Sequence, residues 1–265
     1  MRLRAAITRR RHTAPVRAAS RIAVVVQNAV RNQYNWDFEV NGESLTLEHA
    51  LRDHNGVIFD IGSNTGQWAT QALPRLHGTP LHCFEAIPAI FQQLQANLAG
   101  GDELIYLNNI ALGSEVGTVE FNYCHQTPDV SSRYGIPSKY AQGTIERVTT
   151  QITTGDEYCE FQGIDRISML KVDVEGMEYE VLAGFRSMLE NRRVGVVQFE
   201  YGFGYIGARH YLEDVCALLS RAGYELFRQF PKGLESFTYT EEEEDFRARN
   251  FVAVVPPGRR AADPP

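Results

Sequence analysis

Residues 57–68 read VIFDIGSNTGQW, and this segment indicates the fold class. It begins with a continuous apolar run, which is typical of a strand covered on both faces. Gly62 and Gly66 follow the run and precede a helical pattern. Glycine lets the backbone approach a ligand closely, and a helix N-terminus offers free N–H groups. The segment therefore predicts a strand, a turn that can bind a ligand, and a helix.

Further apolar runs of this kind recur along the chain, at residues 81–84, 104–107, 169–172 and 194–199. Helical patterns lie between them, with apolar stripes at 89–98 and at 211–221. Two closing strands at 224–227 and 251–255 have no convincing helix between them, so we expect them to be antiparallel. The alternation predicts an α/β fold with a mostly parallel open sheet and helices on both faces. Such sheets bind ligands beyond the carboxyl ends of their strands.

The chain divides by composition into a basic arm at residues 1–33, a domain at 34–255 and a disordered tail at 256–265. Residues 1–36 hold eight Arg and no acid, which leaves 18 basic and 33 acidic residues for the remainder, a balance of −15. So acidic a domain is a poor nucleic-acid binder, because binding phosphates requires clustered Lys and Arg. The arm resembles a transit peptide, a basic helix at a membrane surface or a frayed extension, and the sequence leaves these open.

The four cysteines are widely spaced and form no C-x-x-C pair, which argues against a zinc knuckle or a disulfide framework. The longest apolar run of the arm, residues 22–30, contains Gln27 and Asn28 and is too short to span a bilayer. We therefore expect a cytoplasmic protein, with peripheral membrane contact through the arm left open.

Four smaller segments carry local expectations. Residues 34–40 suggest an extended stretch that ends in a tight turn at Asn41-Gly42, and residues 45–54 suggest a short helix. Residues 122–154 are polar and rich in Ser, Thr and Gly, which favours an inserted loop that carries specificity or is simply flexible. The five acids at 241–245 suggest a solvated loop.

Acidic side chains gather where the predicted strands end: Asp60, Glu85, Asp173 and Glu175. Four carboxylates would repel a pyrophosphate, and the spacing Gly62-x-x-x-Gly66 lacks the three glycines of the dinucleotide fingerprint. A cationic ligand that carries a ribose suits them better, because Glu85 can accept hydrogen bonds from both ribose hydroxyls. S-adenosylmethionine has these features. An NAD-dependent oxidoreductase remains an alternative.

Here the sequence resembles the FkbM family of S-adenosylmethionine-dependent methyltransferases, over roughly residues 55–255. The similarity is carried by 57–68, by CFEAIP at 83–88, by LKVDVEGME at 170–178 and by VLAG at 181–184. Ala86 departs from the Pro that the family usually has after the Glu. The resemblance implies a class I methyltransferase fold, Rossmann-like, with seven strands and the last one antiparallel. It also implies O-methylation of a hydroxyl on a sugar, as in a glycan or glycolipid, or on a secondary metabolite.

The resemblance also implies roles for individual residues. Asp173 is expected to face both cofactor and acceptor, and the absence of an [ND]-P-P-[YF] signature there favours a hydroxyl acceptor. Glu85 would hold the ribose. The methionine and ribose part would be lined by Asp60, Gly62, Asn64 and Gly66, and the adenine would be flanked by Asn109, Ile110 and Ala111.

An aliphatic hydroxyl is a poor nucleophile, so a carboxylate or His should take its proton near the transition state. Among the candidates we favour Glu175, then Glu200; the others are Asp173, His125 and His210. Asp173 and Glu175 could share a divalent ion, but without a clear third ligand no metal site is assigned. Polar partners for a sugar in the inserted segment are Asn122, Ser131, Ser132 and Arg133. The rival from another class is a non-catalytic accessory protein that keeps the cofactor fold.

Overall fold

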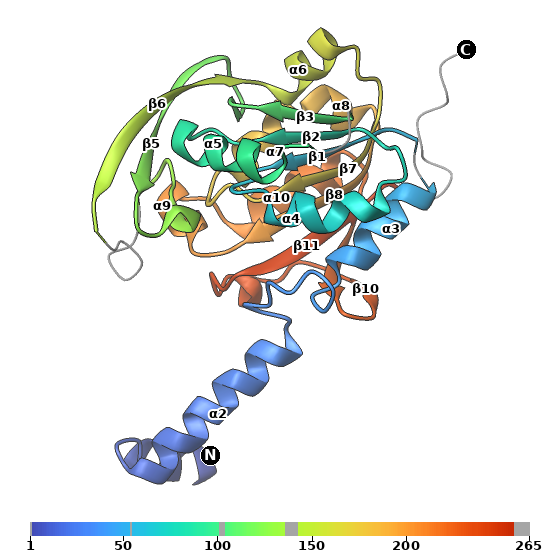
Figure 1. Cartoon of the computed structure of the whole chain (residues 1–265). Helices are drawn as coiled ribbons and strands as arrows, with labels where there is room; N and C mark the ends of the chain where they lie inside the picture. Colours follow the sequence, from blue (N-terminus) through green and yellow to red (C-terminus); the bar gives the residue numbers. More distant parts are fainter. Residues whose placement is uncertain (1, 54, 101–103, 136–142, 257–265) are drawn as a thin grey trace.

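The computed structural model describes residues 2–53, 55–100, 104–135 and 143–256, and its centre is one large sheet (Figure 1). In this part of the chain the sheet has eight strands in the order β10-β9-β11-β8-β7-β1-β2-β3. Neighbours from β3 to β8 pair in parallel, whereas β11 is antiparallel to both β8 and β9. The strands are β1 (Val57–Ile61), β2 (Leu81–Phe84), β3 (Ile105–Asn108), β7 (Ile167–Val172), β8 (Val194–Tyr201), β9 (Glu225–Phe230), β10 (Gly233–Ser236) and β11 (Arg249–Val254).

This strand order confirms the predicted class I methyltransferase fold, with one addition. The seven expected strands are present and the last, β11, is antiparallel. The eighth, β10, forms a hairpin with β9 at the edge of the sheet, where Gly233 pairs with Phe230 and adopts a φ of +129°. A four-residue edge strand is too short to give a periodic signal of its own.

Helices cover both faces of the sheet, as the alternating pattern predicts. One face packs against α3 (Glu43–Asp53), α4 (Gln67–Ala72) and α5 (Pro88–Asn97). The other packs against α6 (Gly155–Gln162), α7 (Glu178–Gly184), α8 (Arg186–Glu190) and α10 (Leu212–Arg221). Successive residues of β1 alternate between the two cores, with Ile58 in the first and Phe59 in the second.

A polar row crosses the first of these faces. The register places Asp60 of β1 beside Lys171 of β7, and Lys171 beside Gln198 of β8; all three are buried. The amide of Gln198 donates to Glu43 Oε1 over 2.7 Å, and Glu43 is the first residue of α3. The row therefore ties α3 to the middle of the sheet.

The prediction of a loop at residues 122–154 was wrong for residues 122–124 and 145–153, which belong to strands. Strands β5 (Gly117–Cys124) and β6 (Ile145–Thr153) form an antiparallel hairpin, and β4 (Ala111–Leu112) completes a small second sheet. The hairpin forms because Val119, Phe121 and Tyr123 recur with period two and bury one side of β5. The polar side chains that suggested a loop occupy the opposite side.

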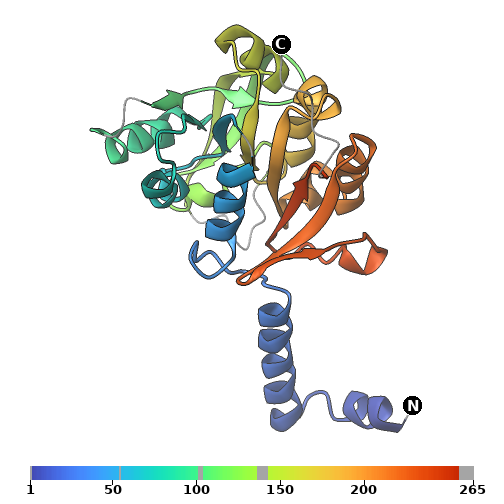
Figure 2. The same ribbon diagram turned by 90° about the vertical axis from the view of Figure 1, so that its right-hand side faces the viewer.

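The arm consists of α1 (Arg2–Arg9) and α2 (Ala14–Val30), and α2 projects away from the domain (Figure 2). No helix in the described residues is both long and apolar enough to cross a membrane. The expected extended stretch at 34–40 is instead a series of turns, because Asn35 and Asp37 side chains accept backbone N–H groups two residues ahead. The expected turn at Gly42 is present, with a φ of +98°.

The acids at 241–245 do not form a solvated loop. Glu243 is buried and pairs with Arg228 and Arg249, and Asp245 pairs with Arg31 and Arg249. Charge composition alone could not show these partners, since Arg228 and Arg31 lie on a preceding strand and in the arm. Of the expected tail, only Pro256 lies within the described residues.

We expect Arg249→Met to lower the free energy of unfolding by about 2–3 kcal/mol, because Glu243 and Asp245 then each lose one of their two arginine partners. Urea denaturation at pH 7 measures this. The matched control is Glu242→Gln, an exposed acid of the same run, which should change stability by less than about 0.5 kcal/mol. Equal stabilities of Arg249→Met and the parent would contradict the ion-pair interpretation.

A second expectation concerns Gly62, which has a φ of +80° and lies against the loop after β7. A Cβ there would be 1.8 Å from the backbone oxygen of Asp173. Gly62→Ala should therefore lower the free energy of unfolding by about 3 kcal/mol, because the backbone is left-handed there and the loop after β7 must move. Gly78→Ala isolates the first contribution, because Gly78 has a φ of +88° and no atom within 4 Å of its Cβ position. We expect Gly78→Ala to lower the free energy of unfolding by about 1 kcal/mol, and urea denaturation of both variants measures the two losses. Equal losses in the two variants would show that the contact with Asp173 is unimportant.

Candidate active site

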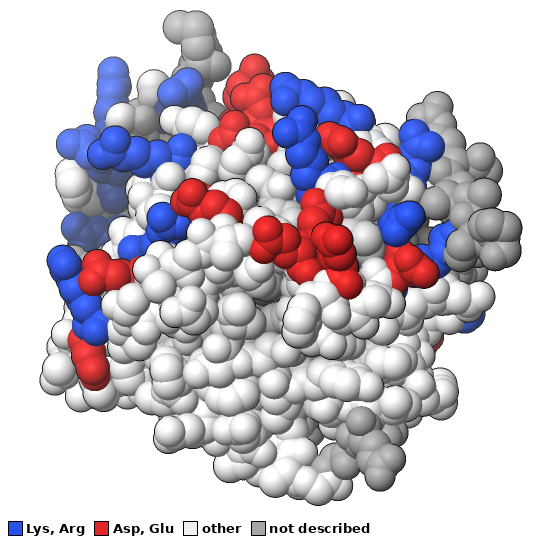
Figure 3. Space-filling view, turned by 90° about the horizontal axis from the view of Figure 1, so that it is seen from above, with Lys and Arg blue, Asp and Glu red and all other residues white. Residues whose placement is uncertain are grey.

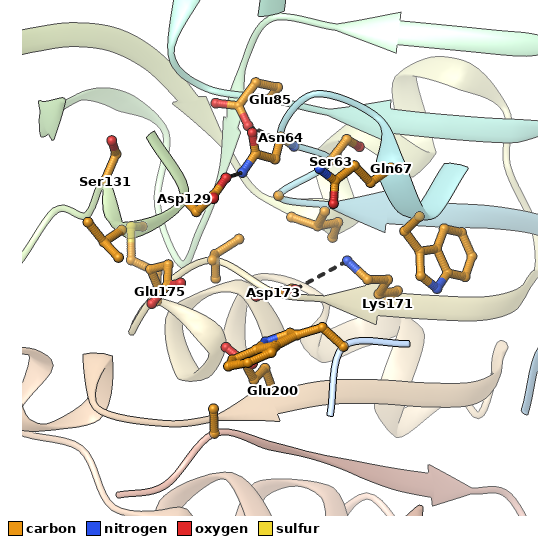
Figure 4. Close-up of a pocket in the computed structure, with 18 of the residues that line it drawn as sticks. Ser63, Asn64, Gln67, Glu85, Asp129, Ser131, Lys171, Asp173, Glu175 and Glu200 are labelled. Carbon is orange, nitrogen blue, oxygen red and sulfur yellow. Dashed lines mark hydrogen bonds and ion pairs between the residues drawn. The ribbon is translucent and has the colours of Figure 1, made fainter. Parts of the chain in front are cut away.

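A cavity of about 590 Å³ lies beyond the carboxyl ends of β1, β2, β7 and β8 (Figure 4). Its size is typical of small-molecule sites, and its position is the one expected for a parallel sheet. The polar and charged residues on its wall include Ser63, Asn64, Gln67, Glu85, Asp129, Ser131, Lys171, Asp173, Glu175, Glu200 and Arg249.

The glycine-containing turn after β1 is held by the end of β2. The backbone N–H groups of Gly62 and Ser63 both donate to the Phe84 oxygen, and the Asn64 N–H donates to Glu85 Oε2 over 3.1 Å. Gly62 and Asn64, two of the four residues predicted to line the methionine and ribose part of the cofactor, line the cavity. Asn64 Oδ1 is buried and has no hydrogen-bond partner among the described residues, so it is available to a ligand.

Asp60 and Gly66, also predicted to contact the cofactor, lie outside the cavity wall. Asp60 is fully buried and accepts a hydrogen bond from Lys171 Nζ over 3.0 Å. Gly66 precedes α4 with a φ of +86°, and a Cβ there would be 2.8 Å from Leu94 of α5. The structure thus gives both residues a packing role beneath the turn.

Glu85 lies at the end of β2 with 7% of its surface exposed. Burial raises the pKa of its carboxyl to about 7, although the N–H groups of Ile87 and Asn64 donate to it and oppose the shift. Asn109 does not line the cavity; its amide donates to the backbone oxygens of Glu85 and Ala86 and holds that loop in place. Its neighbours Ile110 and Ala111 do form part of the wall.

Three carboxylates from two strand ends converge on the other side of the cavity (Figure 4). Asp173, Glu175 and Glu200 can each place one oxygen so that all three oxygens lie within 4.8 Å of one another. Burial and the neighbouring carboxylates raise the pKa of both Glu175 and Glu200. Lys171 Nζ lies 3.6 Å from Asp173 and offsets part of this negative charge. The cluster can share protons or hold a cation, and Glu200 is the third oxygen ligand that sequence spacing could not identify.

Of the four residues predicted to contact a sugar, one lines the cavity and three lie behind it. Ser131 lines the cavity, whereas Ser132, Asn122 and Arg133 do not. Ser132 Oγ donates to the Glu175 backbone oxygen over 2.7 Å, and the Asn122 amide donates to the backbone oxygens of Ser132 and Arg133. These contacts position the loop that carries Ser131.

The two candidate histidines lie away from the cavity wall. His125 Nε2 is 2.9 Å from Glu146 on the hairpin, and His210 Nε2 is 3.1 Å from Glu180. Within the described residues, the carboxylates are therefore better placed than either imidazole to meet a substrate in the cavity.

Several residues that line the cavity were not identified by sequence reasoning. Lys171 stands two residues before Asp173 and thus on the same face of the strand, a periodicity that could have indicated it. Asp129 accepts a hydrogen bond from the Asn64 amide over 2.8 Å and links the hairpin to the glycine turn. Asn32, Tyr34, Asn35 and Trp36 reach the wall from the base of the arm, and no sequence signal pointed to them.

The chain is similar in sequence to several named methyltransferases. The chain is 27% identical over 198 residues to the 2-O-methyltransferase NoeI of Sinorhizobium fredii, which covers 70% of this chain and 79% of that protein. It is 28% identical to the hexuronic acid methyltransferase AglP of Haloferax volcanii, covering 67% of this chain and 66% of that one. The 31-O-demethyl-FK506 methyltransferase FkbM of Streptomyces tacrolimicus is 26% identical to the chain, and the alignment covers 55% of this chain and 66% of that protein.

Solved structures match the chain at low sequence identity. Magnesium protoporphyrin IX methyltransferase from Synechocystis, solved with bound SAM, superposes with a TM-score of 0.40 at 12% identity and covers 81% of this chain and 77% of that one.

The model of the methyltransferase FkbM domain matches residues 60–226, which contain the glycine turn, Glu85 and the Asp173–Glu175 loop. The chain therefore belongs to the FkbM family and is an S-adenosylmethionine-dependent methyltransferase, rather than the NAD-dependent oxidoreductase that the sequence alone left open.

Proposed function

We propose that the protein methylates a hydroxyl of a sugar, free or within a glycan, glycolipid or sugar-bearing natural product. The observation that carries this proposal is the group of carboxylates from Asp173, Glu175 and Glu200 at the cofactor cavity. An alcohol acceptor needs a base, and this group supplies one. The relatives named for 2-O-methylation and for hexuronic acids are consistent with a sugar acceptor.

The residues of the cavity suit S-adenosylmethionine. The buried Glu85 can accept hydrogen bonds from the ribose hydroxyls, and the unpartnered Asn64 Oδ1 can accept one from the cofactor. The acidic side at Asp173 favours the ammonium and sulfonium charges, because opposite charges attract strongly in a partly desolvated site. When bound, the cofactor supplies a methyl carbon that its sulfonium has already activated.

In this scheme Glu175 is the base. It takes the hydroxyl proton as the oxygen forms its bond to the methyl carbon, and the bond between that carbon and sulfur breaks to release S-adenosylhomocysteine. Burial and the neighbouring carboxylates raise the pKa of Glu175, and this makes its carboxylate a stronger base than an exposed one. Asp173, the member of the cluster that lies near Lys171, would orient cofactor and acceptor. Ser131 is the hairpin side chain placed to contact the acceptor.

The direct test measures S-adenosylhomocysteine release with methyl glycosides of hexoses and hexuronic acids as acceptors, and locates the new methyl group by mass spectrometry. We expect an O-methyl ether. A methyl ester on the hexuronate carboxylate would contradict the proposal, because a carboxylate acceptor needs no base. Cofactor binding by calorimetry without turnover on any acceptor would favour the non-catalytic accessory protein.

The pH dependence of cofactor affinity tests Glu85. Below pH 7 its carboxyl holds a proton, and above pH 7 it is ionised and accepts ribose hydroxyls better. Affinity for S-adenosylhomocysteine should therefore rise about tenfold from pH 6 to pH 8 in calorimetric titrations. Glu85→Gln should bind more weakly at pH 8 and lose this rise, while the exposed control Glu115→Gln keeps it. The same rise in Glu85→Gln would exclude Glu85 as its source.

Replacing the carboxylates one at a time tests the base. Glu175→Gln should lower kcat by about 10²–10⁴-fold and change S-adenosylhomocysteine affinity little, because the removed group acts on the acceptor proton. Glu200→Gln should reduce kcat less, and the exposed Glu120→Gln of β5 should behave as the parent. A normal kcat in Glu175→Gln would reject this assignment. Loss of turnover in EDTA with recovery in Mg²⁺ would instead assign the cluster to a metal ion.

A further inference from the structure

Helix α2 carries an apolar face that nothing in the described structure covers. None of its residues is buried, and it extends away from the domain (Figures 1 and 2). At 100° per residue, Ile22, Val25, Val26 and Val30 fall within an arc of about 140°. Arg17 lies on the opposite side together with Val24, and Arg21 lies at the edge of the arc beside Val25. The exposed fractions within the arc are 65% for Ile22, 67% for Val25, 55% for Val26 and 69% for Val30. A contiguous apolar face of this kind marks an interaction surface.

The arm is also strongly basic. Residues 1–36 hold eight Arg and no acid, while the rest of the chain has a balance of −15. The face of the domain seen from above, away from the arm, shows acidic and basic side chains intermixed over one half and few charges over the other (Figure 3). The arm therefore differs from the domain in charge. In α1, Leu3 and Ile7 are also exposed and stand four residues apart.

An anionic bilayer satisfies both properties of the arm at once. The headgroups attract arginine, and the boundary with the acyl chains accepts an apolar helix face. A second copy of the arm would cover the apolar face but would bring two acid-free sets of eight Arg together. A nucleic acid would neutralise the arginines but leave the apolar face in water. Since no described helix can cross a membrane, the arm would lie on the surface.

The base of the arm is fixed to the domain beside the cavity. Arg31 pairs with Asp245 over 3.1 Å, the Gln33 amide donates to the same carboxylate over 2.7 Å, and the Asn32 amide donates to the Gln229 oxygen over 3.0 Å. Residues just after this attachment form part of the cavity wall. One of them, Trp36, is 71% exposed, and Trp is a side chain that favours the membrane–water interface.

We propose that α1 and α2 anchor the protein on the surface of an anionic bilayer, with the apolar face of α2 in the headgroup region, so that residues 32–36 hold the cavity near that surface. The anchor does not depend on the identity of the methyl acceptor. It requires only the amphipathic helix, the arginines and their rigid attachment to the domain.

Co-sedimentation of the full chain with vesicles tests the anchor. Vesicles of phosphatidylcholine with 30 mol% phosphatidylglycerol should bind the protein at least tenfold more tightly than pure phosphatidylcholine, and 0.5 M NaCl should weaken this binding. Arg17→Gln with Arg21→Gln should weaken it by about fivefold per arginine. Equal binding to both vesicle types, or binding to neither, would overturn the proposal.

A matched pair of double variants tests the apolar face. Ile22→Gln with Val26→Gln places two glutamines on that face and should reduce vesicle binding at least tenfold. Ser20→Gln with Val24→Gln places two glutamines at the same spacing on the opposite face and should bind as the parent does. Because α2 buries no residue, both variants should keep parental S-adenosylhomocysteine affinity.

Three outcomes would overturn the proposal. The first is equal vesicle binding by the two double variants. The second is a dimer in sedimentation velocity that Ile22→Gln with Val26→Gln dissociates, without vesicle binding by the parent; this would assign the face to a second copy. The third is binding to duplex DNA without binding to vesicles.

Discussion

The pocket depends on the buried ion pair between Lys171 and Asp60. Removing an ammonium group from water is costly unless a counter-charge compensates it. Burial alone would lower the pKa of Lys171, but Asp60, Asp173 and Glu43 outweigh it and keep the side chain charged. Lys171 also lies 5.7 Å from the centre of the Trp68 ring, a residue of α4. One lysine thus joins β1 and β7 to α4 and places a fixed positive charge beneath the cavity.

That charge compensates only part of the acid at the strand ends. Glu85, Glu175 and Glu200 all have raised pKa values because burial disfavours their ionised forms. A bound cation would favour those ionised forms, so binding of a sulfonium would be coupled to proton release. The cavity therefore suits a cationic ligand, because its carboxylates outnumber the positive charges beside them. The same reasoning explains why a pyrophosphate would be poorly accommodated.

The sequence predicts most of the sheet and the strand-end acids because both follow from apolar runs and their ends. Glu85 and Glu200 come at the ends of such runs, and the structure brings both to the cavity. The position of a residue near a strand end does not show which way its side chain points, and Asp60 turns instead toward Lys171. Contacts between distant segments have no local signal. For this reason Trp36, Asp129 and the partners of Glu243 emerge only from the structure.

In the loop after β7, the residues that hold the backbone in place differ from Glu175, the proposed base. Glu178 is buried, and its carboxylate accepts the N–H groups of Val174 and Gly176. Ser132 holds the Glu175 oxygen from the hairpin, and Gly176 packs against the Gly204 backbone. Glu175 itself has a φ of +53°, a conformation that a non-glycine residue keeps only when its surroundings impose it. The turn that follows Glu175 and two segments distant in sequence therefore fix the backbone of the proposed base. A backbone fixed in this way loses little freedom when an acceptor binds, which is the advantage that a preorganised site has over a mobile one.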